Sequence, residues 1–177
     1  MKNGIRVKLL AITALAVSAF AQTNPVTPLG SAGTLSEKVR HELVMLPYYG
    51  IFDHLAFRVD GDKVTLLGEV SRPTLKTQAE RVVKGLPGVT TVDNHIHVLP
   101  LSLYDDRLRL AFVRTIFGNP VLSRYSWGAQ PPIHFIVENG TLTLKGTVSN
   151  EGDRNLAGIL ANGIPGAFAV NNELVVN

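Results

Sequence analysis

The chain has 177 residues, 45% of them hydrophobic, with 17 Lys and Arg against 14 Asp and Glu, and it has no cysteine. The lack of cysteine excludes disulfides, thiol nucleophiles, cysteine-ligated metal centres and lipid attachment to a cysteine. Three basic residues lie within the first eight positions, so the remaining chain has 14 charges of each sign, which argues against nucleic-acid binding by counterion release.

Residues 1–21 have the pattern of a removable export signal. Lys2, Arg6 and Lys8 form a basic start, an apolar run covers 9–20, and Ala19-Phe20-Ala21 is a small-x-small cleavage pattern. The apolar run is about a dozen residues, whereas a membrane span needs roughly 20. We therefore expect a periplasmic or secreted protein, soluble or peripheral to a membrane; an uncleaved anchor is the alternative.

Residues 22–33 are rich in proline, glycine and small polar residues, which predicts a flexible lead-in. A first domain is expected over 34–100. Apolar residues at helical spacing predict a helix from 34 to Leu46, ended by Pro47. A hairpin follows over 55–59 and 64–70, then a helix over 74–85 and a last strand over 91–98.

A second domain is expected over 101–177, with the same order of elements. Ser102 is the predicted N-cap of a helix over 103–117, whose core face is Leu108, Phe112 and Ile116. Strands over 133–137 and 142–148 flank an Asn-Gly turn, and a helix over 152–162 precedes a strand over 168–176. The predicted fold class is α+β: two tandem αββαβ units, each a three-stranded mixed sheet with two helices packed on one face.

The two domains are copies of one plan. Residues 55–98 align with 133–176 without a gap, and fourteen of the 44 positions are identical. Gly68 and Gly146 lie inside strands, where a missing side chain permits close approach of another backbone. Gly88 and Gly166 follow proline, which fits a turn with positive φ. These shared residues therefore have structural explanations.

The repeated pattern resembles the BON domain family of exported bacterial envelope and osmotic-stress proteins. The resemblance rests on the hairpin motif Val64-Thr65-Leu66-Leu67-Gly68-Glu69-Val70, on Ala79-Glu80, and on Leu86 through Val98; the second copy keeps Gly146, Val148, Ala157, Pro165-Gly166, Val170 and Asn172. It departs at Ala167-Phe168 and at Gly158. The resemblance implies tandem αββαβ units in envelope proteins that bind rather than catalyse, with phospholipid surfaces as the principal partner class and secretion complexes, channels or chaperone-like roles for other members.

Signals of catalysis or of a cofactor are absent from the sequence. There is no P-loop, dinucleotide fingerprint or nucleophile elbow. His95 and His97 share one face of a predicted strand, as a metal pair would, but no third ligand is evident and the second copy lacks both. His54 lies just before a predicted strand, His134 has no obvious partner, and Asp105-Asp106 is typical of a helix start. We expect no enzyme, no cofactor, no metal, no nucleic acid and no small-molecule substrate.

The two copies differ most where the second inserts nine residues near 123–132, including the sole tryptophan. Arginine beside Tyr and Trp suits a lipid headgroup region. The candidate binding residues lie on helix 103–117 and this loop: Arg107, Leu110, Arg114, Phe117, Arg124, Tyr125 and Trp127. The favoured function is a non-catalytic envelope module on anionic phospholipid, in envelope maintenance or stress. Two alternatives remain open: Trp127 and Phe117 cover the second core, or the surface serves protein interaction or a chaperone-like role. The oligomeric state is not predicted.

Overall fold

The computed structural model describes residues 34–128 and 130–177, and it contains two copies of one α+β unit. The predicted signal peptide and lead-in lie outside these residues. The first unit comprises α1 (Thr34–Val44), β1 (His54–Asp60), β2 (Lys63–Val70), α2 (Pro73–Lys84), β3 (Thr91–Asn94) and β4 (His97–Val98). The second comprises α3 (Leu103–Phe117), the short 3-10 helix η1 (Ser123–Ser126), β5 (Ile133–Glu138), β6 (Thr141–Val148), α4 (Glu151–Asn162), β7 (Ala169–Asn172) and β8 (Val175–Val176).

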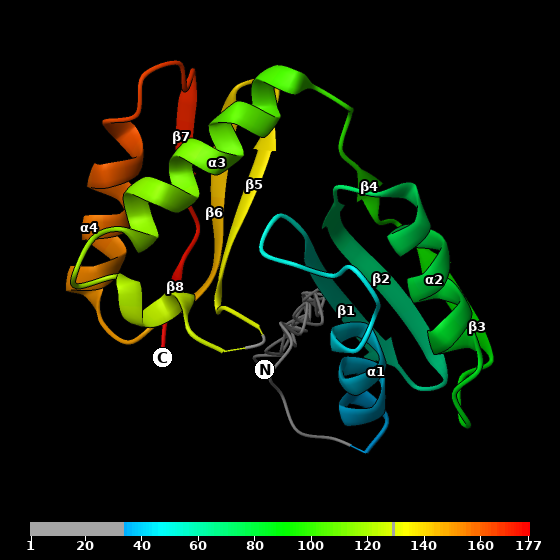
Figure 1. The fold of residues 1–177 in the computed structure, drawn as a ribbon. Helices are drawn as coiled ribbons and strands as arrows, with labels where there is room; N and C mark the ends of the chain where they lie inside the picture. Colours follow the sequence, from blue (N-terminus) through cyan, green and yellow to red (C-terminus); the bar gives the residue numbers. More distant parts are fainter. Residues whose placement is uncertain (1–33, 129) are drawn as a thin grey trace, which may run out of the picture.

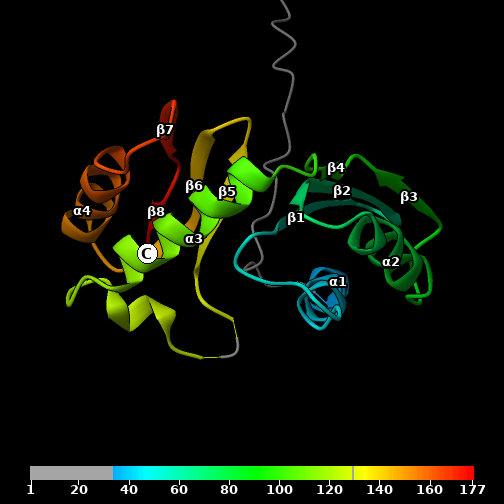
Figure 2. The same cartoon turned by 45° about the horizontal axis from the view of Figure 1, so that its top comes forward.

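Each sheet is mixed and has its hairpin's second strand at the centre. β2 pairs antiparallel with β1 and parallel with β3 and β4, and β6 pairs in the same way with β5, β7 and β8. Both helices of each unit cover one face of its sheet (Figures 1 and 2). The predicted fold class is therefore confirmed.

The last strand of each unit, predicted to be continuous, is interrupted instead. β3 and β4 keep the same register on β2, and the gap between them lies opposite Gly68, where φ is +113°. The Ile96 amide donates to the Asn94 side-chain oxygen at 3.2 Å, which closes a local turn across the gap. Gly146, with φ at +109°, and Asn172 repeat this arrangement in the second unit. Periodicity did not show the gap because the apolar alternation continues through it.

Each unit encloses its own core, built from the faces that the sequence predicts. In the first, Val39 and Leu43 of α1 pack with apolar residues of α2 and the sheet. In the second, Leu108, Phe112 and Ile116 of α3 lie in the core with Phe135 of β5. The first helix ends at Val44, earlier than predicted, and a short turn carries the chain to Leu46, which is still buried.

The helix-free faces of the two sheets meet. Lys145 of β6 forms an ion pair with Glu69 of β2, with Nζ and Oε1 3.1 Å apart, and His97 Nε2 lies 3.0 Å from Glu138 Oε1. The segment before β1 also reaches the second unit: Phe135 N–H donates to the Ile51 carbonyl at 2.7 Å. Ile51 and Phe52, from the first unit, pack against the core of the second. The two units therefore share apolar contacts as well as charges.

Candidate binding surface

The outer face of α3 carries alternating apolar and basic side chains. Leu103, Arg107, Leu110 and Arg114 are spaced by four, three and four residues, which places them on one side of a helix. Leu103 is 79% exposed and Leu110 51% exposed, and both arginines are also exposed. Ser102 fixes the start of the helix, since its side chain accepts a hydrogen bond from the Asp105 amide at 3.1 Å. We call these four residues the outer stripe of α3.

The guanidinium groups of the outer stripe are free to meet an anion. Neither guanidinium group, of Arg107 or of Arg114, makes a hydrogen bond or ion pair with any residue in 34–128 or 130–177. Arg109, on the opposite side of α3, is buried, donates to Asp106 at 2.5 Å and donates to the Val137 carbonyl at 2.7 Å. The helix thus uses one arginine to join the core and leaves two facing solvent.

Arg124 and Tyr125, both predicted to bind, are engaged with a buried carboxylate of the second unit. The Tyr125 hydroxyl donates to Asp153 Oδ2 at 2.5 Å and accepts from the Ser149 amide at 2.9 Å, and Tyr125 is only 7% exposed. Arg124 forms an ion pair with the same carboxylate. The Tyr125 hydroxyl, followed by Arg124, lowers the pKa of Asp153 below its ordinary value. Tyr125 therefore has a structural position.

Of the other candidates on the loop and the helix, one is exposed to solvent and one packs on the core. Trp127 is 78% exposed, so it does not cover the second core. Phe117 does: it packs against that core with its ring edge-on to Phe135, at a centroid separation of 5.2 Å. Of the seven predicted residues, the structure leaves Arg107, Leu110, Arg114 and Trp127 facing outward with no charged partner among the described residues.

Sequence reasoning missed an exposed aromatic pair where α3 begins. Tyr104 stacks on Phe168 with centroids 5.8 Å apart, and Phe168 is 77% exposed. The sequence signal that could have revealed it is a difference between the two copies at one aligned position. The equivalent of Phe168 in the first unit is Thr90, whose hydroxyl donates to Asp62 at 2.7 Å. A polar turn in one copy is thus replaced by an exposed aromatic ring in the other.

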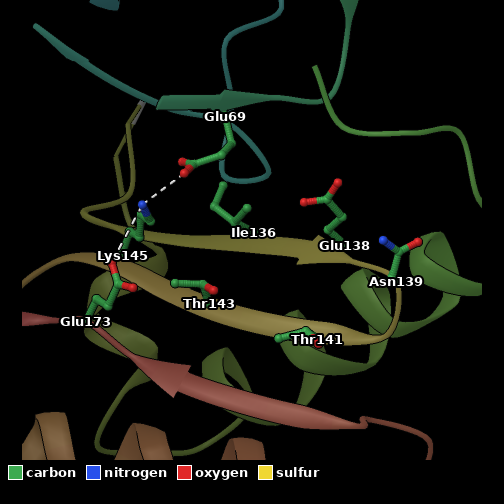
Figure 3. A pocket seen from close by; sticks show the side chains of 8 residues that line it. All are labelled: Glu69, Ile136, Glu138, Asn139, Thr141, Thr143, Lys145 and Glu173. Atoms are coloured by element: carbon green, nitrogen blue, oxygen red, sulfur yellow. Dashed lines mark hydrogen bonds and ion pairs between the residues drawn. The ribbon is translucent and has the colours of Figure 1, made fainter. Parts of the chain in front are cut away.

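Between the units, a polar groove of about 340 Å³ follows the helix-free face of β6. Figure 3 shows Lys145 in its floor between Glu69 and Glu173, to both of which it is ion-paired. Within 34–128 and 130–177, no group of three His, Asp or Glu side chains is arranged to hold a metal ion. Over the same residues, no helix is long and apolar enough to cross a membrane.

These features define a class of protein: a duplicated α+β unit, joined sheet to sheet, that presents a basic and apolar helix face. A family model described as the BON domain matches residues 31–100 and 121–177. The chain therefore belongs to the BON domain family. No curated protein matches it.

Two solved structures are similar to the chain at low identity. One is the C-terminal domain of CdsD, a structural protein of the type III secretion system of Chlamydia trachomatis, at 15% identity over 83% of this chain and 99% of that chain, with a TM-score of 0.30. A second structure of CdsD matches at 15% identity over 81% of this chain and 92% of that chain, with a TM-score of 0.28. Such low scores carry no inference about function.

Proposed function

We propose that this protein is a non-catalytic envelope module that binds anionic phospholipid surfaces through the outer stripe of α3 and Trp127. The observation that carries the proposal is the combination of unpaired Arg107 and Arg114 with exposed Leu103 and Leu110 on one helix face. Guanidinium groups form paired hydrogen bonds with phosphate, and apolar side chains between them enter the boundary between headgroups and acyl chains.

Charge balance sets the strength of this attraction. Because the chain beyond residue 21 carries equal numbers of acidic and basic residues, long-range attraction to an anionic surface is weak. Binding then depends on contact of the stripe itself, where each arginine near an anionic surface contributes about 1 kcal/mol. We expect weak, reversible binding that falls as salt rises.

The test is vesicle flotation of the chain from Gln22 onward, with anionic and with zwitterionic vesicles. We expect flotation with anionic vesicles alone. The charge reversal Arg107→Glu/Arg114→Glu should weaken binding at least about tenfold, because both attractive contributions become repulsive. The matched control is Lys38→Glu/Arg40→Glu, which makes the same charge change on exposed positions of α1.

The apolar contribution is tested separately. Leu110→Ser/Trp127→Ser should reduce binding, whereas Ile159→Ser, at an equally exposed position on α4, should not. Equal flotation of the wild type with both vesicle types, or unaltered binding by the folded charge-reversal variant, would contradict the proposal.

Protein interaction or a chaperone-like role is the second candidate. The exposed Tyr104–Phe168 pair is the observation in its favour, since aromatic residues are enriched at protein interfaces. The helix-free sheet faces are less available for a partner because His54, Glu69, His134 and Lys145 meet one another there. A partner retained from envelope extracts after lipid extraction, and lost in Phe168→Thr, would favour this function.

A further inference from the structure

A cluster of half-buried polar side chains lies where the two units meet. The His54 ring stands edge-on to His134 with centroids 5.9 Å apart, and Tyr49 lies 5.8 Å from His134 on the same measure. Glu69 Oε2 is 3.8 Å from His54 Nδ1, and Lys145 Nζ is 3.1 Å from the other carboxylate oxygen. Tyr49, His54 and Glu69 belong to the first unit, and His134 and Lys145 belong to the second.

The cluster is incompletely hydrogen-bonded. Four of its atoms are buried with no hydrogen-bond partner among the described residues: Tyr49 Oη, His54 Nδ1, Glu69 Oε2 and His134 Nδ1. A buried imidazole without a partner for its second nitrogen tolerates the neutral form but not a positive charge. The two rings are adjacent and edge-on, and Lys145 already supplies a cation, so a proton added to His54 meets like charge.

We infer that the contact between the two units is an acid-sensitive latch, which opens when His54 and His134 become protonated. The closed arrangement holds both rings neutral between the sheets. Separation of the helix-free faces returns the rings to water, where they can take up protons. Opening would expose the groove along β6 and the Ile51 and Phe52 side chains.

Burial and the charges around His54 agree with this direction. Burial, then His134 and Lys145, lowers the pKa of His54 from 6.5 to about 3. Burial also lowers the pKa of His134, although the Gly50 and Asp53 carbonyls and the Asp53 carboxylate oppose this. Of the remaining nearby acids, Glu69 and Glu173 are both held by Lys145. Because the folded pKa of His54 is depressed, the closed contact is fully stable above about pH 6.5 and weakens as the pH falls toward 3.

One contact between the units has the opposite dependence. His97 would attract Glu138 more strongly when protonated, at their separation of 3.0 Å. The His97 side chain is 55% exposed and the Glu138 side chain 38% exposed, and ion pairs that reach solvent in this way are weak. The two less exposed histidine rings between the sheets therefore decide the direction.

The test is amide hydrogen exchange in the full chain, followed at the Phe135 amide, whose hydrogen bond to the Ile51 carbonyl crosses the contact. After correction for intrinsic exchange, protection at Phe135 should fall about 30-fold between pH 7.5 and pH 5, the change in opening constant that the shifted pKa of His54 implies. The Phe168 amide, bonded to Gly140 within the second unit, should change much less.

Two variants test whether His54 causes the pH dependence of protection at Phe135. His54→Phe keeps a ring in place and removes the proton site, so most of the pH dependence at Phe135 should disappear; His54→Gln is the second choice if that variant does not fold. His41→Phe, an exposed histidine on α1, should leave the dependence unchanged. Constant Phe135 protection from pH 7.5 to 5 in the wild type, or an undiminished dependence in the folded His54 variant, would overturn the latch.

Discussion

Buried carboxylates fix the local geometry of both units. Asp105 accepts hydrogen bonds from the Asn139 and Gly140 amides at 3.0 and 2.8 Å, which ties the start of α3 to the β5–β6 turn. In the first unit, Asp53 accepts a hydrogen bond from the Ser71 amide at 2.6 Å, which ties the segment before β1 to the segment after β2. The sequence indicated only that Asp105 suits a helix start; the role of tying two elements together depends on residues more than 30 positions away.

At the residue scale, Tyr125→Phe tests whether this side chain is structural. It removes one hydrogen bond to Asp153 and the acceptor of the Ser149 amide, so we expect a loss of about 1–3 kcal/mol in the free energy of unfolding at pH 7. Vesicle binding by the folded variant should match the wild type. Urea unfolding and flotation measure the two quantities.

The same variant has a predicted pH dependence. The lowered pKa of Asp153 contributes stability that is present above its unfolded value, near 3.8, and is lost as the pH falls through the lower folded value. Tyr125→Phe raises that pKa toward the ordinary value, so its stability defect should shrink in the acid limb. Tyr104→Phe is the matched control, because its hydroxyl bonds to the Gly166 carbonyl at an exposed site and should cost less. A constant defect at all pH values would argue against this account.

At the scale of elements, the glycine of each central strand shapes the sheet. A Cβ on Gly146 would lie 1.9 Å from the Pro132 carbonyl oxygen, and one on Gly68 would lie 2.0 Å from that of His54. The predicted close backbone approach is confirmed at both sites. The positive φ at these glycines also bends β2 and β6, opposite the gaps that interrupt the last strand of each unit. The bend and the gap therefore occur together in both units.

Gly146→Ala should therefore destabilise the second unit by at least about 2 kcal/mol, because it combines an unfavourable φ with a collision against backbone. Gly88→Ala has a similar φ of +97° but nothing within 4 Å, so it should cost only about 1 kcal/mol. Denaturant unfolding compares them. Equal costs would mean that backbone strain alone, and not the collision, requires glycine at 146.

At the scale of the whole molecule, the units are joined through both polar and apolar contacts. Ile51 and Phe52 belong to the first unit by sequence but pack against the second core. Each unit is small, and burying side chains from its neighbour adds to a core that would be marginal by itself. We expect the two units to unfold as one cooperative structure.

Phe52→Ser tests this coupling. Removing the ring should cost about 1–2 kcal/mol and split a single calorimetric transition into two, since it weakens the contact more than either core. Ile159→Ser, which removes an exposed side chain from α4, should change stability by less than about 0.5 kcal/mol. Two separate transitions already in the wild type would contradict the expected cooperativity.

The sequence by itself determined the duplicated unit, the order of its elements, the core faces of α1 and α3, and the positive φ of Gly88 and Gly166 after proline. These features follow from periodicity and turn chemistry, which can be recognised within short windows of the sequence. It also brought Arg107, Leu110, Arg114 and Trp127 into one candidate surface, and the BON resemblance gave the family.

Only the tertiary structure decided which candidates face outward and how the units meet. Tyr125 and Trp127 are two residues apart and chemically similar, yet one bonds to Asp153 inside the unit and the other faces solvent. His134 had no visible partner because the ring that it packs against, His54, lies on the other unit. Such contacts join residues far apart in the chain, and no local pattern records them; they are set by the packing of one sheet face on another.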